Sequence, residues 1–397
     1  MIRPARPEVE LQSALPEAVR VGPALPRRAA LSIGLVLLAC AGLQAQPAPI
    51  VVGISAPLSG PGAAYGRGLQ HGIQLAIARA NETGGIEGRR LELLALDDRG
   101  DAAQAAANAR ELMRRGVVAM TGVHGAAAAA AVAEVLAGAG QATLPLVAPA
   151  TGAEGLREPP RPGVFHLRAG TFDEMNAAML HLDTVGLTRY ALVTQDGAFG
   201  DSARSSLELQ LVRIGLRPVA SRQLAQPTQA RATMAALCAA RPQVVVLALN
   251  EALALAAIEA GRSLSCATQY LVFSETGAAL AARGGSAAMA GLLVTQIVPH
   301  PGNLSHPLIA EYQRALAAQG DALAAGYPSV EGYQAMRVLL EALRACPHEP
   351  GRPCLLQALA NRSFDVAGQR IQFGSQQRQP RPYVEMTLLD AQGRFRR

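Results

Sequence analysis

The chain of 397 residues contains no lysine and no tryptophan, and aromatic residues make up only 4% of it. All 36 basic residues are therefore arginines, which excludes Schiff-base chemistry, a lysine general base and a phosphate loop that ends in Gly-Lys-Ser/Thr. The arginines are thinly spread and are not interleaved with aromatic side chains, as they would be on a nucleic-acid-binding surface. We therefore expect no nucleic acid partner, although the formal net charge is +6.

An apolar run over residues 29–41, preceded by Arg27 and Arg28, is typical of an export signal. It has about half of the roughly 20 residues that a bilayer-spanning helix needs. We expect residues 1–45 to be a signal peptide with a long n-region, cleaved after Ala45. The mature chain would then keep 31 basic and 27 acidic residues, a net charge of +4.

Two other interpretations of this segment stay open. Residues 37–40 read Leu-Leu-Ala-Cys and resemble a lipobox, in which Cys40 would carry a lipid anchor. The pair Arg27 and Arg28 is also compatible with twin-arginine export. We expect a periplasmic protein, with lipid anchoring through Cys40 as the alternative.

Four cysteines remain in the expected mature chain: Cys238, Cys266, Cys346 and Cys354. Export places them where disulfides persist. Turn-forming residues fill the segment from Cys346 to Cys354, so these two form either a small disulfide loop or two free thiols. The redox state of the other two stays open. The chain has no Cys-x-x-Cys or His/Cys zinc spacing, so we expect no metal and no cofactor.

Short β-type runs alternate with helix-type segments along the mature chain, which predicts an α/β fold with parallel sheets covered by helices on both faces. The expected strands are 50–54, 91–97, 117–121, 144–148, 164–168, 190–194, 244–249, 270–274 and 292–296. The expected helices are 69–81, 102–115, 126–137, 174–185, 202–214, 230–240, 252–260 and 329–346. Residues 369–373 and 383–390 are expected to be two strands joined by a polar turn.

Local patterns also predict helix starts. Thr171 and Glu174 have the spacing of a capping box, and Asp101 with Gln104 forms a weaker one. Asp201 or Ser202 is expected to cap the helix that follows.

Two motifs that suggest enzymes are poor matches. In the glycine-rich segment 60–66, the third glycine falls one residue late for a dinucleotide fingerprint and Pro61 removes a backbone donor. Gly200-Asp201-Ser202 resembles a serine-esterase signature, but no histidine spacing indicates a partner for Ser202. We therefore expect no enzyme, with an exported serine hydrolase as a remote alternative.

The remaining candidates are loops that follow strands, where open α/β sheets bind ligands. The first such loop reaches Tyr65, and later ones carry His124 with Gly125 and Ala150 with Thr151. Free amides at a helix start beside a threonine hydroxyl suit a carboxylate.

Several segments resemble the leucine/isoleucine/valine-type periplasmic solute-binding proteins of ABC transporters. Residues 52–61 read Val-Gly-Ile-Ser-Ala-Pro-Leu-Ser-Gly-Pro, and residues 81–93 contain Gly-Gly-Ile-Glu-Gly. Asp97-Asp98 and segments 195–200, 294–299 and 328–333 are also similar to this family. The resemblance covers essentially the whole expected mature chain.

The resemblance implies a type I periplasmic-binding-protein fold of two lobes, joined by three crossover hinge segments that close on a solute. Lobe 1 would comprise residues 46–168 and 297–346, and lobe 2 residues 169–296 and 363–397, with 347–362 as the third crossover region. The crossings are expected near Arg168–Thr171, Gln296–Pro299 and Cys346–Phe364.

The resemblance also implies roles for site residues. His124 and Gly125, with Ala150 and Thr151, match the positions that hold a carboxylate, although a histidine stands where the family has a hydroxyl residue. Asp173, Phe199 and Glu275 match the positions that contact an ammonium group, with Phe199 in place of a tyrosine. Tyr65 completes the expected ligand-binding set.

The expected function is the substrate-binding component of an ABC importer, which captures an amino acid or related organic acid and delivers it to an inner-membrane permease. The protein is expected to be a monomer. A ligand-sensing receptor built on the same fold is the alternative.

Overall fold

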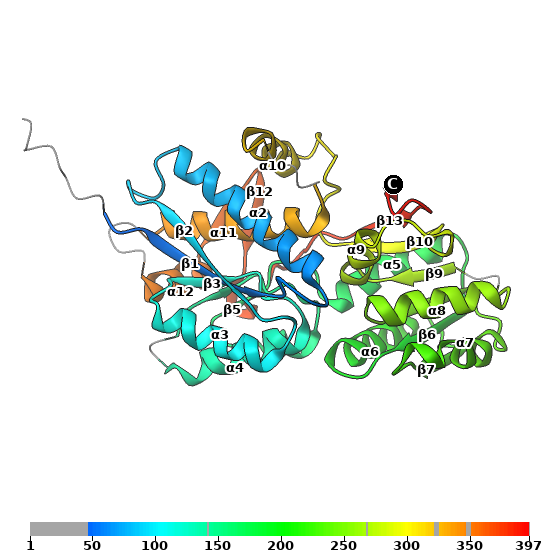
Figure 1. Ribbon diagram of the computed structural model, residues 1–397. Coiled ribbons are helices and arrows are strands. Elements are labelled where there is room, and N and C mark those ends of the chain that lie inside the picture. Colours follow the sequence, from blue (N-terminus) through cyan, green and yellow to red (C-terminus); the bar gives the residue numbers. More distant parts are fainter. Residues whose placement is uncertain (1–46, 141–142, 267–268, 321–324, 347–350, 397) are drawn as a thin grey trace, which may run out of the picture. The chain divides into compact units, whose positions relative to one another are not determined.

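Two mostly parallel β-sheets, each covered by helices on both faces, form the framework of the molecule (Figure 1). The computed structural model describes residues 47–396, except 141–142, 267–268, 321–324 and 347–350. The expected signal segment and Cys40 therefore lie outside the described residues. The α/β class with parallel sheets is confirmed.

The first sheet has five parallel strands in the order β2-β1-β3-β4-β5. They are β1 (Ile50–Ala56), β2 (Leu91–Asp97), β3 (Ala119–Thr121), β4 (Leu146–Val147) and β5 (Val164–Phe165). The helices beside it are α2 (Ala63–Glu82), α3 (Ala102–Arg114), α4 (Ala126–Gly138), α10 (Pro307–Ala318), α11 (Tyr327–Arg344) and α12 (Arg352–Asn361). Alternate residues of β1 point to opposite faces, so Val52 packs with α2 and α11 while Val51 packs with α3 and α4.

The second sheet has seven strands in the order β14-β13-β10-β9-β8-β6-β7. They are β6 (Tyr190–Thr194), β7 (Ala220–Gln223), β8 (Val244–Ala248), β9 (Gln269–Val272), β10 (Leu292–Gln296), β13 (Glu385–Leu389) and β14 (Phe395–Arg396). Its helices are α5 (Thr171–Thr184), α6 (Ala198–Arg213), α7 (Ala230–Cys238), α8 (Glu251–Ser263) and α9 (Ser274–Ala282). β13 and β14 run antiparallel to their neighbours, and the other pairs are parallel. Helices α5 and α6 cover one face and α7 and α8 the other.

The sequence pattern does not predict strand β7 or helices α9, α10 and α12. Three of the four residues of β7 are exposed and its sequence is polar, so it carries no apolar period. Its hydrogen bonds to β6 at the edge of the sheet define it instead. Helix α10 begins with Pro307, since proline is tolerated in the first turn of a helix, where its missing amide would have no partner in any case.

The C-terminal segment differs from the sequence-based expectation. β11 (Ser363–Val366) pairs with β12 (Gln369–Gln372), whereas β13 joins the second sheet beside β10. Residues 363–373 therefore pack beside the first sheet, because Phe364, Val366 and Ile371 are buried in the core that contains α11 and α12. The apolar stripe of α11 offers these three side chains a partner, and no local pattern in the tail specifies that choice.

The helix starts are confirmed in part. Asp101 caps α3, with its Oδ1 accepting a hydrogen bond from the Gln104 amide at 2.7 Å. The capping box at α5 is displaced by one residue, because Asp173 accepts from the Gly170 amide at 2.9 Å and Glu174 is buried elsewhere. Ser202 lies inside α6, whose N-cap is Gly197, so the expected cap at Asp201 or Ser202 is wrong.

Two disulfides tie helices to the segments beside them. Cys346 and Cys354 are bonded, which decides between the two alternatives that the sequence left open. Cys238 and Cys266 form the second bridge, from the end of α7 to the segment before β9.

The close contact between α2 and α11 depends on glycine. A Cβ atom on Gly72 would lie 1.8 Å from the backbone oxygen of Ser329, and one on Gly332 would lie 2.2 Å from the backbone oxygen of Leu69. Backbone atoms cannot move aside as flexible side chains can. The two helices can therefore pack at this distance only if both positions lack a side chain.

We expect Gly332→Ala to lower the free energy of unfolding by about 1–3 kcal/mol or more, because it overpacks this helix contact. Gly138→Ala in α4 is the matched control, since no atom lies within 4 Å of the added methyl group. In Gly138→Ala the unfolded chain has less conformational entropy, so the free energy of unfolding should stay unchanged or rise by about 0.4–1 kcal/mol. Urea unfolding of both variants measures the difference, and equal effects would contradict the packing argument.

Candidate functional site

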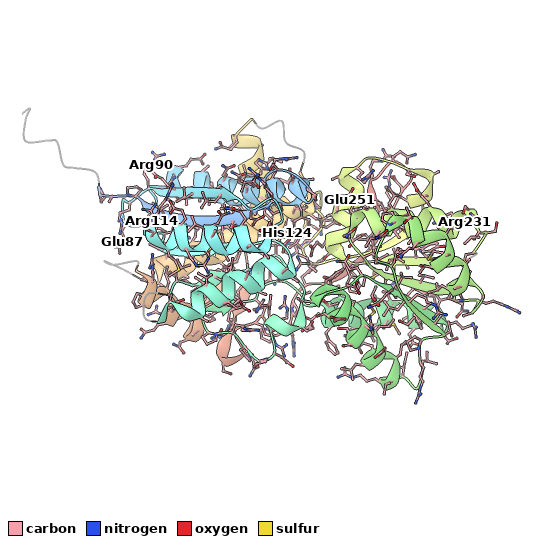
Figure 2. All side chains as sticks on the ribbon, turned by 60° about the horizontal axis from the view of Figure 1, so that its bottom comes forward. Glu87, Arg90, Arg114, His124, Arg231 and Glu251 are labelled. Carbon is pink, nitrogen blue, oxygen red and sulfur yellow. A yellow bond between two sulfur atoms is a disulfide. The ribbon has the colours of Figure 1, made fainter. Side chains whose placement is uncertain are left out.

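A cavity of about 480 Å³ lies at the carboxyl ends of strands from both sheets. Loops after β1, β2, β3 and β4 line it from the first sheet, and loops after β6, β8 and β9 line it from the second. His124 at the start of α4 and Glu251 at the start of α8 are both labelled in Figure 2. Six of the eight expected ligand-binding residues line this cavity: Tyr65, His124, Gly125, Thr151, Phe199 and Glu275.

Two expected residues are placed elsewhere. Ala150 is fully buried beneath the cavity, where its backbone forms a bridge with that of His124. Asp173 lies at the start of α5, where its carboxylate accepts from the Gly170 amide. It lines a separate groove with Ser202. Asp173 is therefore not among the residues that line this cavity.

The first turns of α4 and α6 face the cavity from opposite sheets. Their N-cap residues are Gly125 and Gly197, which have φ values of 89° and 97° and no side chain to satisfy the first amides. Ala126–Ala128 and Ala198–Phe199 line the cavity, and within the described residues the structure gives their amides no acceptor. Such amides, with the positive end of the helix dipole, favour a bound anion.

A histidine and a glutamate meet across the cavity. The Nε2 atom of His124, from the first sheet, lies 3.1 Å from Oε1 of Glu275, from the second. The His124 ring also stacks on Tyr65, with centroids 4.5 Å apart. Burial raises the pKa of Glu275, but His124 and the charge of Arg168 outweigh it and hold this pKa below its ordinary value. The structure thus places the Glu275 carboxylate directly beside the His124 ring.

Thr151 and Phe199 occupy opposite sides of the cavity. Thr151 is 2% exposed, and its hydroxyl oxygen accepts from the Ala153 amide at 3.2 Å, which leaves the hydroxyl hydrogen free to donate. Phe199 contacts Phe273 edge to face, with centroids 5.5 Å apart. One side therefore offers a donor and the other an apolar surface.

Asp97 holds together the two loops at the outer rim. Its carboxylate accepts from the Ser59 hydroxyl at 2.5 Å and from the amides of Leu58 and Arg99 at 2.9 Å. The hydrogen bond from Ser59, together with those from the backbone amides, lowers the pKa of Asp97 to about 2. These contacts position Arg99 at the edge of the cavity.

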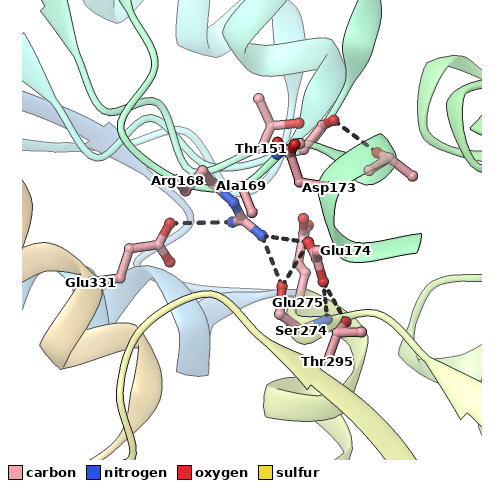
Figure 3. A network of polar contacts seen from close by, with 12 residues as sticks. Thr151, Arg168, Ala169, Asp173, Glu174, Ser274, Glu275, Thr295 and Glu331 are labelled. Carbon is pink, nitrogen blue, oxygen red and sulfur yellow. Dashed lines mark hydrogen bonds and ion pairs between the residues drawn. The ribbon is translucent and has the colours of Figure 1, made fainter. Parts of the chain in front are cut away.

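Beneath the cavity, a buried ionic network centres on Arg168 (Figure 3). Its guanidinium donates to Glu331 Oε1 of α11 at 3.2 Å, to Glu174 Oε1 of α5 at 3.4 Å and to Ser274 Oγ at 2.9 Å. The Tyr65 hydroxyl donates to Glu331 at 2.5 Å, which connects the cavity wall to this network.

Glu174 has further hydrogen bonds, from the Ser274 amide and the Thr295 hydroxyl. This network was not predicted from the sequence. A buried strand-end arginine beside a capping-box glutamate is its only local signal.

The electrostatics of the network follow from burial and pairing. Burial lowers the pKa of Arg168, but Glu331, Tyr65 and Glu174 offset this and the pKa is raised. Burial raises the pKa of Glu174, which Arg168 and the hydrogen bonds from Thr295 and Ser274 counteract. Each charge depends on the others because the site excludes water.

The serine-hydrolase alternative has no support at Ser202. Its hydroxyl accepts from the Glu154 amide at 3.0 Å. Among the described residues that line the groove around Ser202 there is no histidine to act as a base.

The described residues also contain no group of three or more His, Cys, Asp or Glu side chains that could hold a metal ion. No helix among them is both long and apolar enough to cross a bilayer.

We expect Arg168→Met to lower the free energy of unfolding by about 3–5 kcal/mol, because it leaves buried carboxylates without a counter-charge. Arg79→Met is the control: its pair with Glu82 is about half exposed, so the free energy of unfolding should fall by less than about 1 kcal/mol.

The loss of stability in Arg168→Met should grow with pH. Without Arg168 the pKa of Glu174 in the folded protein rises further above its ordinary value of 4.5. A carboxyl group with a raised pKa stabilises the folded state below pH 4.5, and this stabilisation is lost as the pH rises through the folded-state pKa. Urea unfolding at pH 4.5 and pH 7 measures this, and a penalty independent of pH would contradict it.

Comparisons with known proteins agree with this architecture. The sequence profile of the periplasmic binding protein family matches residues 49–394. The Leu/Ile/Val-binding protein BraC3 of Rhizobium johnstonii is 30% identical over 174 residues, which are 43% of this chain and 46% of that protein. The match thus spans less than half the length of this curated relative.

Solved structures match over most of the chain. A substrate-binding periplasmic protein from Ralstonia solanacearum is 30% identical, with a TM-score of 0.76, over 86% of this chain and 98% of that one. A possible leucine/isoleucine/valine-binding protein from Rhodopirellula baltica SH 1 is 26% identical, with a TM-score of 0.78, over 88% of this chain and 96% of that one. Because the family match extends from residue 49 to residue 394 and the fold agrees with it, this chain belongs to the periplasmic binding protein family.

Proposed function

We propose that the protein is the extracytoplasmic substrate-binding component of an ABC importer and that it captures a small carboxylate-bearing solute between its two lobes. The observation that carries the proposal is a cavity lined from both sheets, in which the amide-bearing helix starts of α4 and α6 converge beside the Thr151 hydroxyl. The chemistry is binding and not catalysis. Its partners would be the solute and an inner-membrane permease, with the protein itself a monomer in the periplasm.

The proposed lobes follow the two sheets. Lobe 1 contains the first sheet with α10, α11, α12 and the pair β11–β12, and lobe 2 contains the second sheet. The first two crossings stay near Arg168–Thr171 and Gln296–Pro299. The third lies between β12 and β13 instead of at Cys346–Phe364, because β11 and β12 pack with lobe 1.

Hinge closure would strengthen the polar contacts to the solute. Moving the two walls together excludes water and lowers the local dielectric, so each hydrogen bond to the carboxylate becomes stronger. Hydrogen bonds to a charged group contribute about 1.5–3 kcal/mol each. Together, three such hydrogen bonds contribute nearly the roughly 8 kcal/mol of binding free energy that corresponds to a micromolar dissociation constant.

A ligand-sensing receptor that uses the same module is the second candidate. Permease and ATPase genes beside the gene for this protein favour transport, and a kinase or regulator gene favours sensing. Intact-mass analysis of the native protein would decide between signal cleavage after Ala45 and a lipid on Cys40.

A thermal-shift screen of the mature protein against amino acids, amides and small organic acids tests the proposed function. A solute present at a hundred times its dissociation constant should stabilise the protein by about 2.7 kcal/mol. No shift with any carboxylate would contradict the proposal.

We expect Thr151→Val to weaken binding of the solute found in that screen by about 1.5–3 kcal/mol, because a hydrogen bond to a charged group is lost. Thr276→Val is the matched control in the same cavity. Its hydroxyl donates to the Leu249 backbone oxygen at 2.7 Å, so its loss should lower stability more than affinity. Isothermal titration calorimetry measures both, and an unchanged affinity in Thr151→Val would show that Thr151 does not hold the carboxylate.

A further inference from the structure

The groove that contains Ser202 is separate from the solute cavity, and the proposed capture of a solute makes no use of it. Its volume is about 640 Å³. The segment after β4, the start of α5, helix α6 and the segment between β12 and β13 line it. Its charged lining residues are Glu154, Glu158, Asp173, Asp201, Arg213 and Arg378.

The groove has more negative than positive charge, because four carboxylates face two guanidiniums. Arg378 is paired with Glu158 at 2.9 Å. The guanidinium carbon of Arg213 lies 5.1 Å from the centroid of the Phe172 ring, so the aromatic face already attracts one cation here. In the described part of the chain, the other three carboxylates have no ion pair within the groove: Glu154, Asp173 and Asp201.

Each of these three carboxylates keeps at least one oxygen free to accept a hydrogen bond. Glu154 Oε1 accepts from the Phe172 amide at 2.8 Å, and Asp173 Oδ2 accepts from a backbone amide at 2.9 Å. Burial raises the pKa of Glu154, and the Phe172 amide and the charge of Arg157 counteract this only in part. A positive group in the groove would therefore stabilise the ionised form of Glu154.

Arg157 does not fill this role. Its guanidinium lies behind the groove and is 2% exposed, and it donates to the backbone oxygen of Thr151 at 2.9 Å. Its charge balances one of the three carboxylates, which leaves an excess of negative charge in the groove.

A buried hydroxyl group indicates a ligand independently of charge. Ser206 of α6 is 3% exposed and lines the groove. Its hydroxyl has no hydrogen-bond partner among the residues that the structure describes. A buried polar group without a partner costs free energy, and a ligand atom in the groove would supply that partner. Phe172 and Leu209 add apolar surface beside it.

The arrangement of the carboxylates favours an organic cation over a metal ion. No group of three or more His, Cys, Asp or Glu side chains in the described ranges could hold a metal. An ammonium group on an aliphatic chain suits such a groove better, because the chain can contact apolar surface while the charged end binds a carboxylate.

We infer that this groove is a second binding site and that it takes a primary aliphatic amine. The ammonium group donates hydrogen bonds to the free carboxylate oxygens of Glu154 and Asp173 and to the hydroxyl oxygen of Ser206. The aliphatic chain packs against Phe172 and Leu209. A second ammonium group, in a diamine, would bind Asp201.

Calorimetric titration of the mature protein with butan-1-amine and 1,4-diaminobutane tests the inference, with butan-1-ol as the uncharged control. The amines should bind with dissociation constants of about 1 mM or tighter, and the alcohol at least about tenfold more weakly. Asp173→Asn keeps an oxygen that can accept from the Gly170 amide but loses the charge, so it should weaken amine binding by about tenfold.

Ser206→Ala separates binding from folding. It should weaken amine binding by about threefold or more, because one hydrogen bond to a charged group is lost. The temperature of thermal unfolding without amine should not fall, since the hydroxyl has no partner to lose in the described protein. An unchanged amine affinity in both Asp173→Asn and Ser206→Ala would overturn the inference.

Two other carboxylates serve as controls. Glu208→Gln removes an exposed charge of the same helix outside the groove, and Asp196→Asn removes one from the solute cavity. Both variants should bind the amines as the unaltered protein does. An equal loss in Glu208→Gln would show nonspecific attraction to the surface, and a loss only in Asp196→Asn would place the amine in the solute cavity. Either result, or no binding in the millimolar range, would contradict the second site, whereas the proposed function is tested separately by the screen with carboxylates.

Discussion

The buried guanidinium of Arg168 is the constraint on which the rest of the structure depends. It lies where the chain leaves the first sheet for α5, and its partners come from α11, α5 and α9. Such an ionic cluster does not by itself stabilise a fold more than an apolar core would, because every charge loses its hydration. What it imposes is a fixed geometry: Glu174 and Glu331 remain buried only while Arg168 lies between them.

That geometry reaches the cavity through two contacts. Tyr65 donates to Glu331 below and stacks on His124 above. Arg168 also helps to hold the pKa of Glu275 below its ordinary value. Residues that line the cavity are therefore coupled to residues at the crossing between the sheets. Under the proposed hinge closure, this coupling would give a physical route by which occupation of the cavity and the arrangement of the hinge affect each other.

The position of the cavity follows from parallel sheets. The carboxyl ends of parallel strands lie at one edge, and the helices that follow begin there with unsatisfied amides. Gly125 and Gly197 leave those amides uncapped, because neither carries a side chain that could accept a hydrogen bond. Where other helices of the same molecule are capped by Asp101 or Asn250, these two starts keep their amides for another acceptor.

The local sequence determined most of the framework. Alternation of apolar runs predicted the α/β class and nine strands of the two sheets, since burial on both faces produces continuous apolar segments that need no distant partner to be seen. The loops that carry Tyr65, His124, Thr151, Phe199 and Glu275 were predicted because they follow strands and resemble a family. Each of these residues does line the cavity. Their roles toward a solute remain predictions.

Only the tertiary structure decided the rest, because it depends on contacts between residues far apart in the chain. Glu174 has the spacing of a capping-box residue, yet it is buried against Ser274 and Thr295, which lie 100 and 121 positions away in the chain. The tail from 363 to 373 follows the apolar stripe of α11 and not the second sheet. His124 and Glu275 meet only because two sheets face one cavity. Sequence patterns indicate which faces are apolar, whereas the contact between His124 and Glu275 is set by the packing of the folded chain.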